Sequence, residues 1–378
     1  MADNKENRIP NVPHLRFPEF SGEWEETTLG KISEITKGSG ISKDQLSEQG
    51  SPCILYGELY TKYNSEVIGV VYSRTELESS SLVKSKANDV IIPCSGETAI
   101  DISTARCVPF NNILLGGDLN IIRLKHDDGG FFAYQLNGAR KKDIARVAQG
   151  VSVVHLYGEN LKHIRVYHPV IEEQKKITRL LSLIDERIAT QNKVIEKLES
   201  LIKGIAHRVA GMGKPNVCLK ECLECTSSTL QESEVSDLGP YPVYGANGIV
   251  GFLDSYNTPD EAIYIVKDGS GVGSVAYVKG KCSATGTLNI LTAKQDYSLQ
   301  FLYYMLKVFN FEPYKTGMAI PHIYFKDYSK AKIFCSSYSK QLRYAKMLEA
   351  IDAKLLIEQK VFISLNSQKQ YLLRLMFI

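Results

Sequence analysis

The chain has 378 residues, too many for one ordinary domain and suited to two or three. Apolar residues make up 44% and charged residues 23%, as in soluble globular proteins, and no apolar stretch reaches the roughly 18 residues that a membrane span needs. The net charge of +3 neither supports nor excludes an acidic partner such as a nucleic acid. Eight cysteines do not make a disulfide scaffold in a chain of this length, and the polar first seven residues lack the hydrophobic part of a secretory signal, so we expect a cytoplasmic protein.

Residues 1–168 have the pattern of a block of short strands and loops that ends in a helix. Strand-like runs lie at residues 53–56, 67–72, 89–92 and 119–122, and glycines separate them. A helical stretch follows at residues 131–147. This combination predicts an α+β domain.

Residues 169–211 predict a long helix with a narrow apolar stripe. Pro169 and the glutamates in the next turn suit a helix start. Apolar positions then recur every 3.5 residues, which is typical of a helix that packs along a partner helix rather than on its own domain. The stripe consists of Ile177, Leu181, Ile184, Ile188, Ile195, Leu198 and Ile202. A helix of this length is a rod of about 60 Å.

The second half, residues 212–378, has the same layout. Strand-like runs lie at residues 241–244, 263–266 and 274–278, a helical stretch at 299–309, and a second long helix at 336–378. The short linker at residues 211–215 makes the second helix return along the first, so we expect an antiparallel coiled coil within one chain. Its stripe includes Leu348, Ile351, Leu355, Phe362 and Leu365, and it extends from Tyr344 through Leu372 to Met376. Glu358 and Lys369 interrupt it, as Gln191 interrupts the first.

An internal repeat relates the halves. Residues 150–157 (GVSVVHLY) align with residues 317–324 (GMAIPHIY) at a shift of 167 positions, and the shift continues without a gap through both long helices. It pairs Gln174 with Gln341 and Asp185 with Asp352. Upstream the halves diverge and the alignment needs gaps. The pattern predicts a pseudo-twofold chain in which the helices are a shared frame and the two blocks are free to differ.

Basic and tyrosine side chains in the two blocks are candidates for DNA contacts, since cations and hydroxyls suit phosphate and groove contacts. An ordinary solvated surface is the alternative for each of them. The candidates are Lys62, Lys84, Lys86, Ser95, Arg106, Arg140, Lys141, Arg146, Lys267, Ser270, Lys281, Lys315 and Tyr324.

Three motifs invite a catalytic or cofactor-binding interpretation. Residues 218–225 have an iron–sulfur-like Cys spacing, but the repeat aligns Cys222 with Ile32, which favours core packing. The glycines at 269–273 precede a strand rather than a helix, which favours a tight turn over a dinucleotide site. His155 and His322 recur without a paired nucleophile or carboxylate, so we expect structural histidines. We therefore expect no catalytic site and no metal site.

The chain resembles the specificity subunit of type I restriction–modification systems. The resemblance rests on residues 12–24 (VPHLRFPEFSGEW), on the helix entry at 169–177 (PVIEEQKKI) and on the ending at 372–378 (LLRLMFI). The second helix entry departs from the pattern, because residues 336–341 (SSYSKQ) lack the proline and the paired glutamates, so we expect that helix to begin differently.

The resemblance implies two target recognition domains, at residues 1–168 and 212–335, separated by spacer helices at 169–211 and 336–378. It implies a non-catalytic subunit that recognises an asymmetric bipartite site in double-stranded DNA and directs adenine methylation or restriction by its partners. Those partners would be two methyltransferase subunits and a restriction motor subunit, which would carry S-adenosylmethionine, ATP and Mg²⁺. A scaffold or inhibitor protein that reads no DNA, and an enzyme built on the cysteine cluster, are the alternatives.

Overall fold

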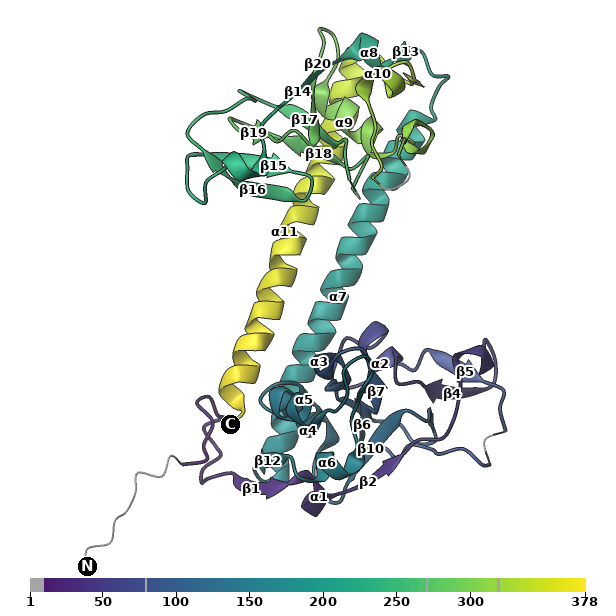
Figure 1. Cartoon of the computed structure of the whole chain (residues 1–378), viewed down its shortest axis with the longest axis vertical. Helices are drawn as coiled ribbons and strands as arrows, with labels where there is room; N and C mark the ends of the chain where they lie inside the picture. Colours follow the sequence, from purple (N-terminus) through teal and green to yellow (C-terminus); the bar gives the residue numbers. More distant parts are fainter. Residues whose placement is uncertain (1–9, 79, 270, 318–319) are drawn as a thin grey trace, which may run out of the picture. The chain divides into compact units, whose positions relative to one another are not determined.

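The computed structural model describes residues 10–78, 80–269, 271–317 and 320–378. They form two compact units, each built from one block and segments of both long helices. Unit 1 contains residues up to 191 and residues 361–378, and unit 2 contains residues 192–360. The helices are α7 (Ile171–Ala210) and α11 (Tyr338–Met376) (Figure 1).

Unit 1 is built on a four-stranded antiparallel sheet in the order β2-β10-β6-β8, with α4 packed against it. A second sheet has the order β3-β5-β4-β9, and its β4–β9 pair is parallel. The strands are β1 (Glu25–Thr28), β2 (Ser33–Lys37), β3 (Leu46–Ser47), β4 (Ser51–Ile54), β5 (Ser73–Thr75), β6 (Asp89–Pro93), β7 (Ser95–Gly96), β8 (Arg106–Val108), β9 (Leu114–Leu115), β10 (Leu119–Leu124), β11 (Val154–His155) and β12 (Arg165–His168). The helices are α1 (Leu29–Ile32), α2 (Glu58–Thr61), α3 (Ala99–Ile102), α4 (Gly129–Asn137), α5 (Lys141–Val147) and α6 (Gly158–Lys162).

Unit 2 repeats the central sheet with the order β14-β20-β17-β18, and α9 packs against it. A three-stranded sheet, β16-β15-β19, lies beside it. The strands are β13 (Val217–Cys218), β14 (Leu223–Ser227), β15 (Tyr241–Gly245), β16 (Gly248–Leu253), β17 (Ala262–Val266), β18 (Val275–Val278), β19 (Ser283–Ala284), β20 (Leu288–Ala293) and β21 (Lys332–Ile333). The helices are α8 (Leu219–Cys222), α9 (Leu299–Lys307) and α10 (Phe325–Tyr328). The α+β prediction is therefore confirmed for both blocks.

The central sheet of unit 1 is buried on both faces. Ile91 and Ile121 point into a core shared with the second sheet, whereas Val90 and Ile122 point into a core shared with both long helices. Successive residues of a strand face opposite sides, so a strand between two cores must be apolar throughout. This explains the uninterrupted apolar run in β6.

Two expectations about local structure are wrong. Residues 67–72 form an extended loop with a single isolated bridge at Val67, not a strand, and Val70 and Tyr72 are exposed. The helical stretch at 131–147 is two helices, because the chain turns at Gly138 between α4 and α5. Apolar composition alone does not distinguish an extended loop from a strand, since a strand also needs a neighbour for its backbone.

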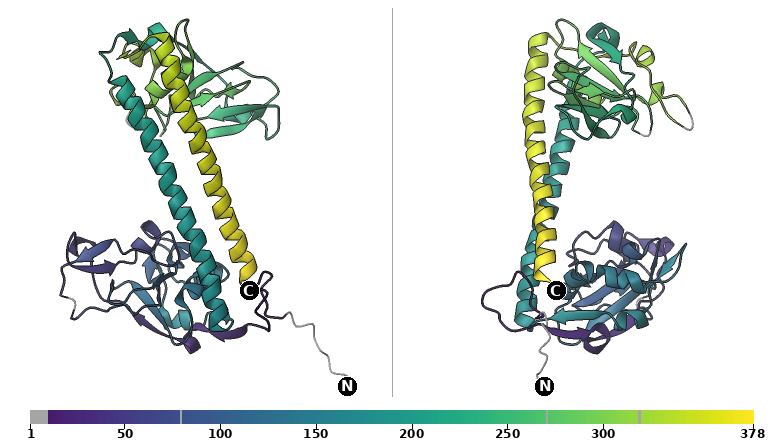
Figure 2. Two further views of the ribbon diagram at one scale, coloured as in Figure 1. Left: turned by 180° about the vertical axis from the view of Figure 1, so that it is seen from behind. Right: turned by 60° about the vertical axis from the view of Figure 1, so that its left-hand side comes forward.

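Within each unit, the two long helices run in opposite directions, as predicted. The ribbons of α7 and α11 can be followed in Figure 2. In unit 1, Ile177 and Leu181 of α7 share a core with Leu373 and Met376 of α11. In unit 2, the hydroxyl of Tyr344 lies 3.3 Å from the sulfur of Met212, just beyond the end of α7. All the predicted stripe residues are buried or half-buried, which confirms the apolar stripe.

The second long helix begins at the position equivalent to the first, contrary to expectation. Ile171 and Tyr338, the first residues of the two helices, are 167 positions apart. Gln174 accepts a hydrogen bond from the backbone N–H of Asp128, and Gln341 accepts one from that of Ser298, at 2.9 and 3.0 Å. Each glutamine also donates to the carbonyl two residues before its helix. The glutamine contacts therefore recur at both helix entries, although the second entry lacks the proline and the paired glutamates.

Candidate nucleic-acid interface

The end of the central sheet in unit 1, where β6 stops and β10 starts, borders an open cleft. The cleft has a volume of about 1070 Å³. It is lined by Gly40, Ile41, Ser42, Lys43, Gln45, Leu46, Leu55, Tyr56, Gly57, Glu58, Tyr60, Thr61, Lys62, Gly116, Gly117 and Asp118. Gly38 and Gly116 let two segments meet beside it, because a Cβ on Gly38 would lie 1.9 Å from the carbonyl oxygen of Gly116. The sheet edge thus presents three segments of the block, residues 40–46, 55–62 and 116–118, to one hollow.

The side chains of this cleft combine hydrogen-bonding groups with exposed aromatic rings. Tyr56 and Tyr60 are 36% and 40% exposed, and Lys43 and Gln45 lie on the opposite loop. Lys62 donates to the carboxylate of Glu58 at 2.6 Å. Amide and ammonium groups can donate to base edges and phosphates, and tyrosine offers both a ring face and a hydroxyl. The cleft is therefore equipped to contact a nucleic acid.

A small hairpin stands beside the same sheet end in each unit, and we call this pair the twin hairpins (residues 149–155 in unit 1, and the described residues 316–317 and 320–322 in unit 2). Two backbone hydrogen bonds of 2.7 and 2.9 Å close the first, between Gln149 and His155. Two of 2.8 and 2.9 Å close the second, between Thr316 and His322. The next residue after each hairpin donates to the strand end, at Cys94 and Lys267 respectively. The same closing and anchoring hydrogen bonds therefore recur in both units.

The histidines of the twin hairpins are not buried structural residues. His155 is exposed and its ring stacks on that of Tyr157, with ring centroids 6.3 Å apart. His322 is half-buried and its ring lies 5.8 Å from that of Tyr324. Both tyrosines are 46% exposed. The expectation of structural histidines is wrong for His155, because its side chain is at the surface.

The structure places some of the predicted residues of unit 1 at this sheet end. Lys62 lines the cleft, and Ser95 pairs with His155 through β7 and β11. Lys84 and Lys86 are exposed on the loop that leads into the opposite end of β6. Neither lysine lines the cleft.

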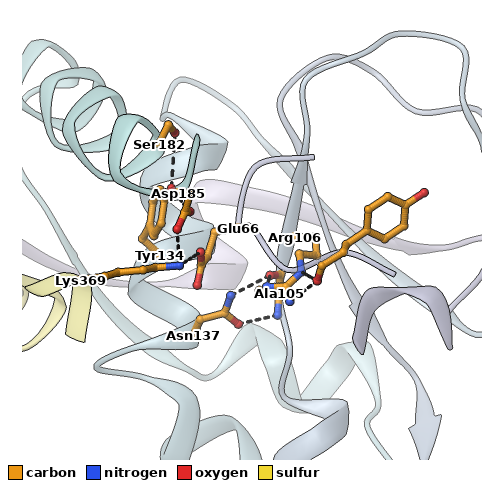
Figure 3. Close-up of polar contacts among 9 residues, drawn as sticks. Glu66, Ala105, Arg106, Tyr134, Asn137, Ser182, Asp185 and Lys369 are labelled. Carbon is orange, nitrogen blue, oxygen red and sulfur yellow. Dashed lines mark hydrogen bonds and ion pairs between the residues drawn. The ribbon is translucent and has the colours of Figure 1, made fainter. Parts of the chain in front are cut away.

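The structure does not support Arg106 as a DNA contact. It is 8% exposed, and its guanidinium donates two hydrogen bonds to the carbonyl of Tyr63, at 2.7 and 3.1 Å (Figure 3). A buried guanidinium that is already bonded to the backbone is not open to DNA. Arg106 therefore has a structural role, because it holds the loop that follows α2.

The basic cluster around α5 is only partly available. Arg140 bonds to Asp143 and to the carbonyl of Ile378, and it stacks on the ring of Tyr167. Lys141 is half-buried, and burial, together with Arg106 nearby, lowers its pKa. The side chain of Arg146 is 76% exposed, although it pairs with Asp143 at 3.0 Å. Of the three predicted residues, Arg146 is the one positioned to meet a ligand.

In unit 2, Lys267 lies at the end of β17, and its carbonyl accepts a hydrogen bond from Ile323 beside Tyr324. Lys281 is exposed and lies over the ring of Tyr256, and Lys315 pairs with Glu312 at 2.6 Å. Ser270 lies outside the described residues. The structure thus brings Lys267 and Tyr324 together beside a twin hairpin.

Residues 271–273 form a turn that leads into β18, as expected for a tight turn, whereas residue 270 lies outside the described residues. Gly269 and Gly273 have φ angles of +97° and +90°, and the N–H of Gly273 donates to the carbonyl of Val266. Cys222 is buried, which confirms the core-packing interpretation, and Cys225 is half-buried on β14.

A buried ionic network ties the block of unit 1 to both long helices. Lys369 of α11 lies 2.6 Å from Glu66 and 2.6 Å from Asp185 of α7 (Figure 3). Burial and the charge of Glu66 raise the pKa of Asp185 to about 6. Burial opposes the ionisation of Glu66 as well, but Lys369 outweighs it and lowers the pKa of Glu66. One lysine therefore pairs with two carboxylates. Its positive charge outweighs the effect of burial at Glu66 but not at Asp185.

The network is specific to unit 1. Asp185 and Asp352 are equivalent by the repeat, and each accepts a hydrogen bond from a tyrosine, Tyr134 at 2.7 Å and Tyr304 at 2.9 Å. The position equivalent to Lys369 is the buried residue Ile202. The tyrosine contact is thus common to both units, whereas the ion pairs are an addition to the first.

The sequence analysis missed the cleft residues Lys43, Gln45, Tyr56 and Tyr60. A partial signal was present, since Tyr56 aligns with Tyr244 in the repeat. The remaining cleft residues come together only because separate loops end at one sheet edge, which no local pattern encodes.

Comparison with known proteins decides the family. Residues 21–200 and 214–366 match the family model described as the type I restriction modification DNA specificity domain. The chain belongs to this family. The two matches cover the two halves of the repeat, so each half of this specificity subunit corresponds to one family domain.

Related proteins agree over most of the chain. A Mycoplasma genitalium protein named as a type I specificity subunit is 22% identical, with 94% of each chain covered. The crystal structure of the type I restriction-modification system S subunit from M. genitalium has a TM-score of 0.70 at 19% identity, covering 97% of this chain and 99% of that chain. A chain from a structure on complex assembly and conformational transition of the type I R-M system has a TM-score of 0.53 at 15% identity, covering 94% and 97%. These structures show that the fold is shared.

Among the residues that the structure describes, no helix is both long and apolar enough to cross a membrane.

Proposed function

We propose that this specificity subunit reads an asymmetric bipartite site in double-stranded DNA, with each block reading one half of the site. The observation that carries the proposal is the contrast within the repeat. The helix entries, the aspartate–tyrosine contacts and the twin hairpins recur in both units, whereas the other loops of the two blocks differ in sequence. Two unlike readers on a shared frame suit a site with two unlike halves. The long helices would set the number of unread base pairs between the halves.

We further propose that the subunit itself carries out no chemistry and directs its partners. It would position two methyltransferase subunits for adenine methylation and join a restriction motor subunit for cleavage. S-adenosylmethionine, ATP and Mg²⁺ would be held by those partners, and the cytoplasm is the expected location. Membership of the specificity-domain family supports this assignment.

A block exchange tests the division of labour. Residues 216–335 would be replaced by the corresponding block of another family member, and the methylated adenines would be mapped in cells that carry the complete system. We expect one half of the recognised site to change and the other half to stay the same. A change in both halves, or in neither, would contradict the proposal.

A further inference from the structure

We propose that the twin hairpins contact the sugar–phosphate backbone of DNA, one hairpin at each half of the site, and add affinity without adding sequence preference. The inference rests on the proposed function, because it assigns a role to one part of each reading surface. It concerns the exposed pairs His155–Tyr157 and His322–Tyr324 and the basic segments around them.

The repeat has kept the same histidine and tyrosine at both hairpins. Between the two units, less exposed positions have changed, as with the buried Cys94, which is equivalent to the half-buried Lys267, and the half-buried Ile32, which is equivalent to the buried Cys222. The histidine and tyrosine pair is the same in both, although the tyrosines are 46% exposed. Surface residues that are kept while less exposed positions change point to a ligand rather than to packing. If the two blocks read different bases, the ligand that both share is the backbone.

Each hairpin contains a glycine in a left-handed backbone conformation. Gly150 and Gly317 have φ angles of +115° and +87°. A Cβ at these positions would lie 2.2 and 2.3 Å from the carbonyl oxygens of Val153 and Ile320. Both positions therefore depend on glycine, and in the two units the histidine and tyrosine that follow have their ring centroids 6.3 and 5.8 Å apart. A fixed shape suits a contact that fixes the orientation of the protein on a duplex.

The segments that contain the hairpins are basic. The equivalent segments 140–165 and 307–332, which contain the hairpins, hold eleven Lys and Arg against four Asp and Glu. The whole chain has 45 against 42, so the remaining residues carry 34 against 38. The positive charge of a nearly neutral protein is thus concentrated around the twin hairpins, which is the distribution expected of a surface that meets phosphate.

The chemistry of the side chains fits this ligand. A tyrosine hydroxyl and an imidazole N–H both donate hydrogen bonds, and such groups commonly contact phosphate oxygens. Arg146 and Lys326 are exposed cations next to the two hairpins, and Lys326 lies over the ring of Tyr324. The hairpin tips also expose apolar residues, Val151 and Ile320, which a pocket on a protein partner could accept. The surrounding charge favours DNA, and the experiment separates the two.

The test uses the full chain, reconstituted with its methyltransferase partner, and two fluorescent duplexes of equal length that contain either the recognised site or a scrambled sequence. Tyr157→Phe and Tyr324→Phe remove one hydroxyl each and keep the ring. Tyr371→Phe, an equally small change at a tyrosine that is 52% exposed on α11, is the matched control. Arg146→Ala and Lys326→Ala are measured at several salt concentrations.

We expect Tyr157→Phe and Tyr324→Phe each to weaken binding about three- to tenfold, by the same factor on both duplexes, and the control to change neither. Arg146→Ala and Lys326→Ala should each lower the slope of log affinity against log salt by about one. A loss confined to the recognised duplex would mean base reading and would overturn the inference. Unchanged DNA binding with weaker capture of the methyltransferase would mean a protein-docking hairpin and would also overturn it. If the wild-type protein does not distinguish the two duplexes, the proposed function itself fails.

Discussion

At the scale of single residues, Lys369 carries the largest consequence in unit 1. Its ammonium lies between Glu66 and Asp185, and the lysine and both carboxylates are less than 10% exposed. A buried charge without its partner costs far more than a surface charge, because little water replaces the lost contact. The residue that interrupts the apolar stripe of the second helix is therefore a specific link between the block and both helices.

We expect Lys369→Met to destabilise unit 1 by about 3–5 kcal/mol, because it leaves two buried carboxylates without their cation. The free energy of unfolding would be measured by urea denaturation. Lys360→Met, at an exposed lysine of the same helix, is the control and should change stability by less than about 0.5 kcal/mol. Equal stability of the two variants would show that the network is solvated and not buried.

The raised pKa of Asp185 predicts a pH dependence. Between the ordinary aspartate value of 3.8 and about 6, the folded protein binds a proton at Asp185 that the unfolded chain does not. Stability from this group is therefore present at low pH and is lost as the pH rises through about 6. We expect Asp185→Asn to remove this loss from a plot of unfolding free energy against pH. Asp352→Asn, at the equivalent position of unit 2, changes no member of the Lys369 network and should leave this loss of stability in place.

At the scale of elements, the twin hairpins and the helix entries show how a duplicated chain preserves local geometry. Gln174 and Gln341 make the same two contacts although the flanking sequences differ. A side-chain amide that accepts from one segment and donates to another ties a helix start to its sheet without depending on the surrounding residues. For this reason the second helix begins in register despite its unusual sequence.

We expect Gly150→Ala and Gly317→Ala to distort the hairpins, at a cost of about 1–3 kcal/mol each, because a left-handed φ and a close carbonyl both exclude a Cβ. Thermal unfolding of the full chain would report the change. Gly204→Ala is the control, since nothing lies within 4 Å of a Cβ at this helical position, and it should be neutral or stabilising by up to about 1 kcal/mol. Loss of stability in the control alone would contradict the geometry.

At the scale of the whole molecule, each compact unit combines one block with a piece of each half of the chain. In unit 1, Leu15 near the start donates to the carbonyl of Leu375 near the end, and Arg16 makes an ion pair with the buried Glu173 at 2.7 Å. The first block is therefore completed by the last residues of the chain. Truncation at the C-terminus should damage the first block rather than the second.

The proposed division of chemistry makes a further prediction. The chain alone should neither methylate nor cleave DNA, and photo-crosslinking with labelled S-adenosylmethionine should mark the methyltransferase subunit in the reconstituted complex. The measurement is the radioactivity of each subunit after electrophoretic separation, with unlabelled cofactor in excess as the control. Labelling of the specificity subunit that excess unlabelled cofactor abolishes would contradict the proposal that the partner holds the cofactor.

The sequence by itself determined the repeat, the α+β blocks and the long helices with their apolar stripes. These features are periodic, so the spacing of residues along the chain is enough to recognise them. Recognising them does not require knowledge of the residues they pack against. It also determined the family resemblance, through motifs at the two ends and at the first helix entry.

Only the tertiary structure decided which side chains meet. Arg106 resembled any surface cation in the sequence and is buried, whereas His155 resembled a core residue and is exposed. In the sequence, Lys369 is only a polar interruption of an apolar stripe. The fold shows its partner, Glu66, which lies 303 positions away in the chain. Burial and pairing depend on residues distant in the chain, and local patterns carry no information about such neighbours. For the same reason the cleft at the sheet end could be found only after folding.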